Sequence, residues 1–388
     1  MKNLITLALV LASTSAFATR ARVTALGNSA HLSDVTTVYR NASWMMTLAD
    51  SLTIESGATA NNFATSATVA PIVPVPDAVD RSNVNAGSEG LLIRSMGDAK
   101  FALGLGHDDS TSFANRGFAN AAALNAGLVW NIKPQQNPLF LAYAMKMGDM
   151  SVGAGLRYSN FDDKKNDEKE SSMALNFGAR SAAWDVALDL GLTDEWKTGT
   201  TNAQPSDSYK GKSAISLTGG YNVTETMYVN AGFKTGGAKL EDAAAEVADI
   251  AYTNITVGVT ESIKKDGAEF FYGAGLLSAS TEEKKSDTKI TAMKMPLIIG
   301  LEAEANSWLT LRGSVTQTLL LVDSDKTATA GVASVETSPG ANSTTLAAGA
   351  GLKFNKVTVD GSILAGGSQV INATAGNLLG QVGLTYAF

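Results

Sequence analysis

The two histidines are the side chains best suited to acid–base or metal chemistry. His31 lies near the start of the chain, and His107 precedes Asp108 and lies close to Ser110 and Ser112. A histidine, a carboxylate and a serine can together make a hydrolytic nucleophile. Adjacent residues of a strand point to opposite faces, however, so His107 and Asp108 are poorly placed to form a dyad. We expect His107 to be a polar residue at the end of a strand, and the protein not to be an enzyme.

Composition argues against cofactors and against nucleic acid as a partner. The chain has no Cys and only two His, which makes a tight transition-metal site improbable. The glycine pairs at 219–220, 236–237 and 366–367 are not followed by a Lys-Ser/Thr step or a helix, so they are not phosphate-binding loops. The formal net charge is −7, whereas binding to phosphates favours a basic surface. We therefore expect no cofactor, no bound metal and no nucleic acid.

The first residues have the three parts of a secretory signal peptide. Lys2 supplies a positive charge, residues 4–11 (LITLALVL) are apolar, and Ala16 and Ala18 form an A-x-A cleavage site. The apolar run is too short to cross a bilayer, which requires about 20 residues. We expect residues 1–18 to be removed, leaving Thr19 as the first residue of an exported protein.

The rest of the chain is predicted to form β-strands, because apolar residues alternate with small or polar ones from about residue 89 onward. A period of two places each apolar set on one face of a strand. One such set is Leu139, Leu141, Tyr143, Met145 and Met147, and another is Trp184, Val186, Leu188 and Leu190. The opposite face carries Gly, Ala, Ser, Thr and Asn with few charges. A small polar face opposite an apolar one is typical of a barrel whose outside meets lipid and whose inside is polar.

The links between these segments alternate between short and long. Short links are 148–149, 180–181, 222–226, 264–267, 304–307 and 355–356, and long links are 161–170, 193–211, 237–249, 281–288, 323–342 and 366–377. Outer-membrane barrels have short periplasmic turns and long extracellular loops. The sequence therefore predicts an all-β, transmembrane, antiparallel up-and-down β-barrel over residues 48–388.

The strand count follows from the same segments. About twelve strands lie after Met150, and candidates upstream are 48–56, 89–96, 99–107, 121–132 and 138–148. Because single-chain bacterial barrels have an even number of strands, we predict about 16, with 14 to 18 possible. The charged stretches 162–170 and 282–289 are expected to be solvated loop tips. Loop 193–211 is expected to lie on the surface, with inward folding as a constriction the alternative.

The last residues resemble the C-terminal signature of bacterial outer-membrane proteins. Leu384, Tyr386 and Phe388 alternate with Thr385 and Ala387 up to the terminal Phe. This resemblance implies that the barrel-assembly machinery reads the last strand, and that the protein lies in the outer membrane of a Gram-negative bacterium.

The mature N-terminus carries two further resemblances. Residues 22–27 (RVTALG) and 39–42 (YRNA) resemble the opening of outer-membrane long-chain fatty-acid transporters, with Ala42 where those proteins have Pro. The same stretch is similar to porin-like major outer-membrane proteins of Bdellovibrio-type bacteria. In the fatty-acid transporters this segment plugs the barrel, which implies a plug at residues 19–47. The candidate plug residues are Leu26, Gly27, Asp34, Arg40 and Asn41.

Three functions fit these patterns. The polar, sparsely charged inner face favours a porin for passive diffusion of small hydrophilic solutes. The resemblance over residues 22–42 suggests instead a transporter for hydrophobic compounds. A structural envelope barrel or adhesin is the third alternative. In each case the expected partners are outer-membrane lipids, lipopolysaccharide and the barrel-assembly machinery, with small solutes as cargo of a channel.

Overall fold

The structure, a computed structural model, describes residues 19–57, 88–107, 135, 137–165, 167–199, 207–242, 245–285, 287–329, 332–336, 343–367 and 377–388. The expected cleavage residues Ala16 and Ala18 and the expected strand 121–132 lie outside this part of the chain. The statements below concern the described residues.

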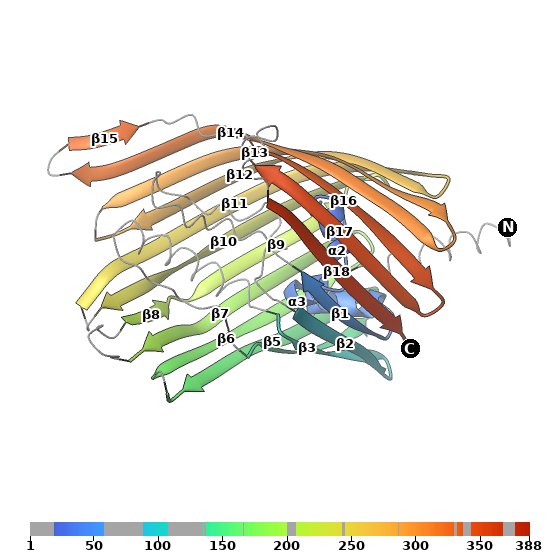
Figure 1. The fold of residues 1–388 in the computed structure, drawn as a ribbon, viewed down its shortest axis with the longest axis horizontal. Coiled ribbons are helices and arrows are strands. Elements are labelled where there is room, and N and C mark those ends of the chain that lie inside the picture. Colours follow the sequence, from blue (N-terminus) through green and yellow to red (C-terminus); the bar gives the residue numbers. More distant parts are fainter. Residues whose placement is uncertain are drawn as a thin grey trace.

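Eighteen strands form one closed antiparallel sheet (Figure 1). The first half contains β1 (Ser51–Gly57), β2 (Ser88–Met96), β3 (Ala99–Leu105), β4 (Leu139–Met147), β5 (Met150–Asp163), β6 (Glu168–Arg180), β7 (Trp184–Thr198), β8 (Asp207–Gly211) and β9 (Ala214–Asn222). The second half contains β10 (Met227–Asp242), β11 (Ala245–Lys265), β12 (Ala268–Glu283), β13 (Thr288–Asn306), β14 (Leu309–Thr329), β15 (Val332–Glu336), β16 (Ser343–Phe354), β17 (Val357–Gly367) and β18 (Asn377–Ala387).

These strands occupy sixteen wall positions, which confirms the predicted up-and-down barrel and its strand number. Strands β8 and β9 both pair with β7 and β10, so together they fill one position. Strands β15 and β16 likewise share one edge of β14. The ring closes because β1 pairs with β2 on one side and with β18 on the other. Strand β3 pairs directly with β4.

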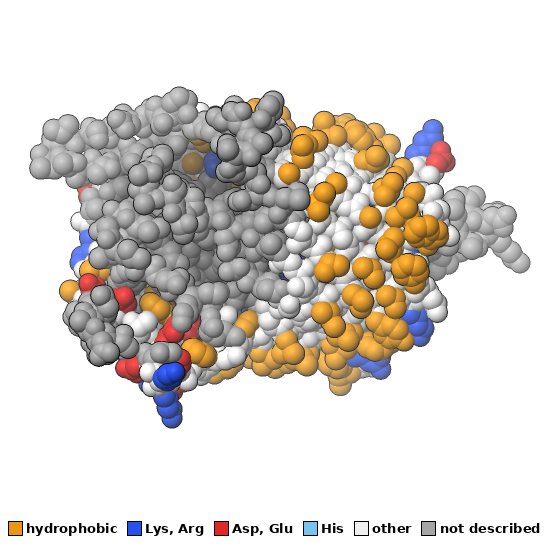
Figure 2. Space-filling view, in the orientation of Figure 1, with side chains coloured by type: hydrophobic (Ala, Val, Ile, Leu, Met, Phe, Trp, Pro, Cys, Tyr) orange, Lys and Arg blue, Asp and Glu red, His pale blue; other side chains and the backbone are white. Residues whose placement is uncertain are grey.

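Alternation of side chains gives the wall an apolar outside. On β4, Leu141 and Tyr143 are exposed, whereas Phe140, Ala142 and Ala144, which alternate with them, are buried. The apolar set predicted for this strand therefore faces outward. Figure 2 shows hydrophobic side chains spread over the outer surface, with Lys and Arg gathered at its edge. Such a surface is unfavourable in water and suits contact with hydrocarbon.

The two ends of the barrel differ. At one end, tight turns at 97–98, 148–149, 266–267, 307–308 and 355–356 join the strands, and we call it the short-turn end. At the other, the hairpin end, several expected long loops are strand extensions instead. Strand β5 continues to Asp163 and β6 begins at Glu168, and β11 and β14 are each 21 residues long. The hydrogen-bond ladder continues through these polar stretches because backbone pairing does not require apolar side chains.

In the described part of the chain, three short helices precede β1 and lie within the ring of strands, as the blue segments of Figure 1 show. They are α2 (Arg20–Ala25), α3 (Thr37–Arg40) and the 3-10 helix η2 (Ala42–Thr47). Residues 19–47 are called the N-terminal segment below. Among the described residues, no helix has the length and apolar character needed to cross a membrane.

Candidate functional site inside the barrel

The N-terminal segment packs against the inner wall at the short-turn end. Val23, Leu26 and Leu32 form an apolar cluster with Phe271 of β12. A second cluster joins the other half of the segment to β2, β3 and β4, and consists of Val35, Val38, Tyr39, Ala42, Met45, Leu48, Leu91, Ile93, Ala102, Phe140, Ala142 and Ala144. The segment is therefore held by buried contacts along its whole length.

Four of the five candidate plug residues support this packing through side chain or conformation. Leu26 is fully buried, and Gly27 has φ +65°, a left-handed conformation that favours glycine. A Cβ on Gly27 would also lie 2.7 Å from Ile298 Cδ1 of β13. The carboxylate of Asp34 accepts a hydrogen bond of 2.9 Å from the backbone N–H of Thr37 at the start of α3.

Asn41 ties the segment to the wall, and Arg40 does so through its backbone. Asn41 Nδ2 donates to the Val186 carbonyl at 3.1 Å, and its Oδ1 accepts from the N–H of Ser43 at 3.1 Å. Asn176 of β6 donates to the carbonyl of Arg40 and accepts from the N–H of Ala42 at 3.3 Å. The wall thus satisfies backbone groups that the short helices leave open.

An ion network joins α2 to the wall at the short-turn end. Arg22 Nε and Nη2 donate to the two carboxylate oxygens of Glu302 on β13, at 2.7 and 2.9 Å. Arg312 of β14 donates to the same Glu302 at 2.6 Å and to Asp360 of β17 at 2.6 Å. Asp360 also accepts from Thr19 Oγ1 at 3.0 Å. Paired donors of a guanidinium on one carboxylate are strong and directional.

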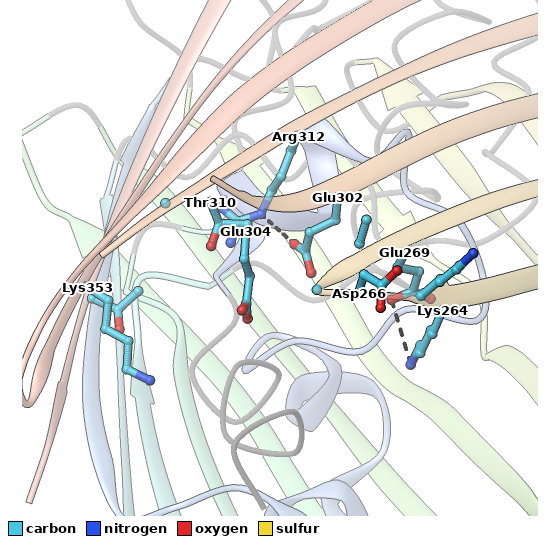
Figure 3. Close-up of a pocket in the computed structure, with 13 residues that line it drawn as sticks. Lys264, Asp266, Glu269, Glu302, Glu304, Thr310, Arg312 and Lys353 are labelled. Carbon is cyan, nitrogen blue, oxygen red and sulfur yellow. Dashed lines mark hydrogen bonds and ion pairs between the residues drawn. The ribbon is translucent and has the colours of Figure 1, made fainter. Parts of the chain in front are cut away.

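A small cavity adjoins this network at the short-turn end. It has a volume of about 210 Å³ and is lined by the turn that joins β11 to β12 and by residues of β11, β12, β13, β14, β16 and β17. Figure 3 shows Arg312 directed toward Glu302, Glu304 projecting into the space, and Lys353 on the far side. The mixed charges show that this mouth of the barrel is polar.

A second network involves Arg20 and the strands β1 and β2. The backbone N–H of Arg20 donates to Glu55 at 2.6 Å, and its guanidinium donates to Glu89. His107 Nδ1 lies 2.6 Å from the other oxygen of Glu89. The His107 ring also stacks on Tyr39, with centroids 3.7 Å apart and planes 4° apart. Arg20 therefore meets two wall carboxylates and a wall imidazole.

The two histidines both lie at the contact between the N-terminal segment and the wall. His31 Nε2 is 3.3 Å from Glu269 of β12, and its Nδ1 is 2.9 Å from Ser29 Oγ. The acid partner of His107 is Glu89, which sequence reasoning missed because the two lie on different strands. Asp108, Ser110 and Ser112 lie outside the described residues. Among the described residues, no group of three His, Asp or Glu could hold a metal ion.

Burial and charge shift the pKa values of three residues of the segment. Burial acts to lower the pKa of Arg22, but the hydrogen bond and charge of Glu302 outweigh it and raise that pKa. For Arg20 burial is likewise outweighed by Glu89 and Glu55, so its pKa is also raised. Burial raises the pKa of Tyr39 well above its ordinary value, and the charge of Glu89 adds to this. Both arginines are held as cations.

An apolar cluster lines the inside of the strand extensions at the hairpin end. Trp196 and Tyr209 face each other across β7 and β8 and are nearly fully buried, whereas the neighbouring Lys210 is exposed. Trp196 Nε1 donates to Glu168 at 2.8 Å. The expectation that these aromatics belong to a plain surface loop is therefore wrong. The cluster comprises Trp196, Tyr209, Ala238, Leu240, Ala248, Ile250 and Tyr252.

Comparisons with known proteins add little to this geometry. No family model matches the chain, and no curated protein matches its sequence. Among solved structures, a bacterial polysaccharide outer membrane secretin has 8% identity and a TM-score of 0.48, covering 88% of this chain and 98% of its own. The toluene transporter TodX of Pseudomonas putida has 10% identity and a TM-score of 0.40, covering 96% of this chain and 98% of its own. A porin has 10% identity and a TM-score of 0.38, covering 87% of this chain and 99% of its own. Likenesses this distant carry no argument about function.

Proposed function

We propose that this protein is a channel of the Gram-negative outer membrane for small hydrophilic solutes, with the N-terminal segment as a plug at its short-turn end. The apolar outer surface supports a membrane location, because a closed barrel satisfies every backbone hydrogen bond within lipid. In this view the short turns face the periplasm and the extended hairpins face outward.

The polar inner wall supports hydrophilic cargo. Inward positions between the two ends carry polar and charged side chains, which are buried inside the barrel. They include Arg157, Ser159, Asn176, Asp189, Ser216, Lys234, Asn254, Thr260 and Ser314. A wall of this kind is typical of water-filled barrels and unsuited to a purely apolar passage.

The observation that carries the plug is the buried ion pair of Arg22 with Glu302. The side chains of the two residues are only 6% and 14% exposed, and the pair joins a helix inside the lumen to the wall. Removing one partner of a buried pair typically costs about 3–5 kcal/mol. Arg312 keeps Glu302 partly paired, so we expect the cost here to be at the lower end.

Planar-bilayer recording tests this function. We expect the wild-type protein to give few or small conductance steps, and Arg22→Ala to give larger or more frequent ones, because the plug is less firmly held. Lys210→Ala is the control, since Lys210 is an exposed wall residue whose ion-pair partner, Glu195, also belongs to the wall. Gel mobility with and without boiling shows that each variant is folded. Bilayers that stay free of steps with folded wild type and folded Arg22→Ala alike would refute the channel.

A transporter for hydrophobic compounds is the second candidate, favoured by the apolar cluster around Trp196 and Tyr209. If hydrophobic cargo binds along these strands, Trp196→Ala and Tyr209→Ala should each reduce uptake of a labelled fatty acid by cells, whereas Lys197→Ala should not. Deleting residues 19–45 should also change this uptake. Unchanged uptake in all folded variants would remove this candidate.

Export and assembly form part of the same proposal. Cleavage before Thr19 would place the mature N-terminus beside Asp360, inside the barrel. Outward-facing Leu384 and Tyr386 on the last strand, with the exposed Phe388 directly after it, would form the signal for the barrel-assembly machinery. Outer-membrane lipids and lipopolysaccharide are the proposed surroundings. The expectations of no enzymatic activity and of no nucleic acid partner stay predictions.

A further inference from the structure

Two wall carboxylates face each other inside the barrel, and among the described residues no Lys or Arg of the wall forms a salt bridge with either. Glu55 of β1 is paired with Glu89 of β2 in the strand register, and their side chains are 7% and 4% exposed. Like charges directly opposite each other destabilise a sheet. A buried pair of this kind is stabilised by a cation nearby or by a proton shared between the two carboxylates.

The cation present is Arg20 of the N-terminal segment. Its guanidinium donates to Glu89 and its Nε lies 3.8 Å from Glu55 Oε2. That Glu55 oxygen is buried and has no hydrogen-bond donor among the described residues. A small cavity of about 10 Å³ lies beside it, lined by Arg20, Glu55, Glu89 and Gln381 among others. Arg20 therefore fills the site but leaves one buried acceptor of the pair without a donor among the described residues.

Comparison with the Arg22 network shows why this pair is different. If Arg22 leaves, Glu302 and Asp360 both keep the guanidinium of Arg312, which belongs to the wall. If Arg20 leaves, Glu89 keeps only the imidazole of His107, and Glu55 keeps no cation among the described residues. Without Arg20, the described part of the wall leaves the two facing carboxylates with one imidazole and with no guanidinium or ammonium group.

We propose that Glu55 and Glu89 form a binding site within the lumen for organic cations of the guanidinium type, which Arg20 occupies as a tethered ligand. A guanidinium presents N–H donors in a plane and suits two carboxylates better than a spherical ion does. A free cation that competes with Arg20 would loosen the start of the N-terminal segment. This consequence for transport rests on the proposed channel function, whereas the binding site itself does not.

Chemical rescue tests the site. Arg20→Ala is purified in detergent, and the temperature at which the folded band is lost from gels is measured with guanidinium chloride at millimolar concentration. We expect Arg20→Ala to melt below wild type, and guanidinium to raise its midpoint by about 2 °C or more through binding to the folded state. Urea at the same concentration is the control, because it has nearly the same shape without the charge, and sodium chloride matches the ionic strength.

Two further variants locate the effect. The upward shift should disappear in Arg20→Ala combined with Glu89→Gln or with Glu55→Gln, and wild type should show none because Arg20 fills the site. Arg20→Gln takes the place of Arg20→Ala if the latter does not assemble. An equal effect of urea, no upward shift with guanidinium, or rescue that persists without either carboxylate would overturn the assignment. Because the readout is melting, a protein that never conducts in bilayers can still pass or fail this test.

Discussion

At the scale of single residues, the inner wall is shaped to receive the N-terminal segment. Several wall glycines stand where a side chain would collide with it. A Cβ on Gly153 of β5 would lie 2.7 Å from the carbonyl carbon of Ala42 and 2.7 Å from the backbone nitrogen of Ser43. A Cβ on Gly383 of β18 would lie 2.7 Å from Thr19. These glycines are required by close approach, which explains part of the high glycine content.

Gly153→Ala should therefore displace the segment without opening the barrel. The added methyl meets backbone, which cannot rotate away, so we expect a loss of about 1–3 kcal/mol in stability. Gly313→Ala is the matched control, because its nearest contact is an ordinary 3.6 Å to the Ala347 carbonyl. Melting of the folded band reports stability, and maleimide labelling of Val23→Cys reports release of the segment, since the native chain has no Cys. Equal behaviour of the two alanine variants would contradict this packing.

At the scale of an element, a strand changes its environment along its length. The outward face of β11 is apolar at Ile255, Val257 and Val259, which are 39–50% exposed. Toward the hairpin end its inward face becomes apolar instead, at Ile250 and Tyr252, which belong to the Trp196 cluster. One continuous ladder thus passes from a segment suited to lipid to a segment that packs internally.

Arginine substitutions along β11 test this division. Val257→Arg places a charge on the outward face within the apolar region, and we expect it to cost about 2–4 kcal/mol in lipid. Ala245→Arg lies at the exposed start of the same strand, at the hairpin end, and should cost close to nothing. Folding titrations with urea in lipid vesicles measure both. A similar cost at both positions would argue against the proposed depth of the strand in the membrane.

At the scale of the whole molecule, the barrel and the N-terminal segment form one unit. Three sites on the segment, Arg20, Arg22 and His31, reach carboxylates on widely separated parts of the ring, from β1 to β13. The N-terminal segment therefore links separate strands of the wall across the interior. The formal net charge of the chain is −7, and several acidic side chains face inward.

The acidic balance predicts a weak preference for cations in any current that the proposed channel carries. In a potassium chloride gradient, the reversal potential should lie on the cation side, because inward carboxylates attract cations and repel chloride. Raising the salt concentration should weaken this preference by screening. A reversal potential on the chloride side would show that the inward lysines and arginines dominate the lumen instead.

Much of the barrel could be predicted from sequence, because the alternation of side chains along each strand shows which of its faces is apolar. The alternation of Leu141 and Tyr143 with Phe140 and Ala142 is a local property, set by the geometry of an extended chain. The turn residues then mark where each strand ends, and the expectation of an even number of strands indicates how many make up the closed ring. The length of the hairpins could not be predicted in this way, since polar strand extensions and polar loops share the same composition.

What the sequence determined by itself is thus the closed sheet, its strand number to within two, and its apolar exterior. Only the tertiary structure decided which residues meet inside. Trp196 has the same parity as outward-facing Val186 and Leu188, yet it faces inward because β7 has one extra residue near Leu192, which reverses the alternation. The pairs of Arg20 with Glu89 and of Arg22 with Glu302 join residues 69 and 280 positions apart. No local pattern encodes such pairs, because they depend on how the whole ring closes around the segment.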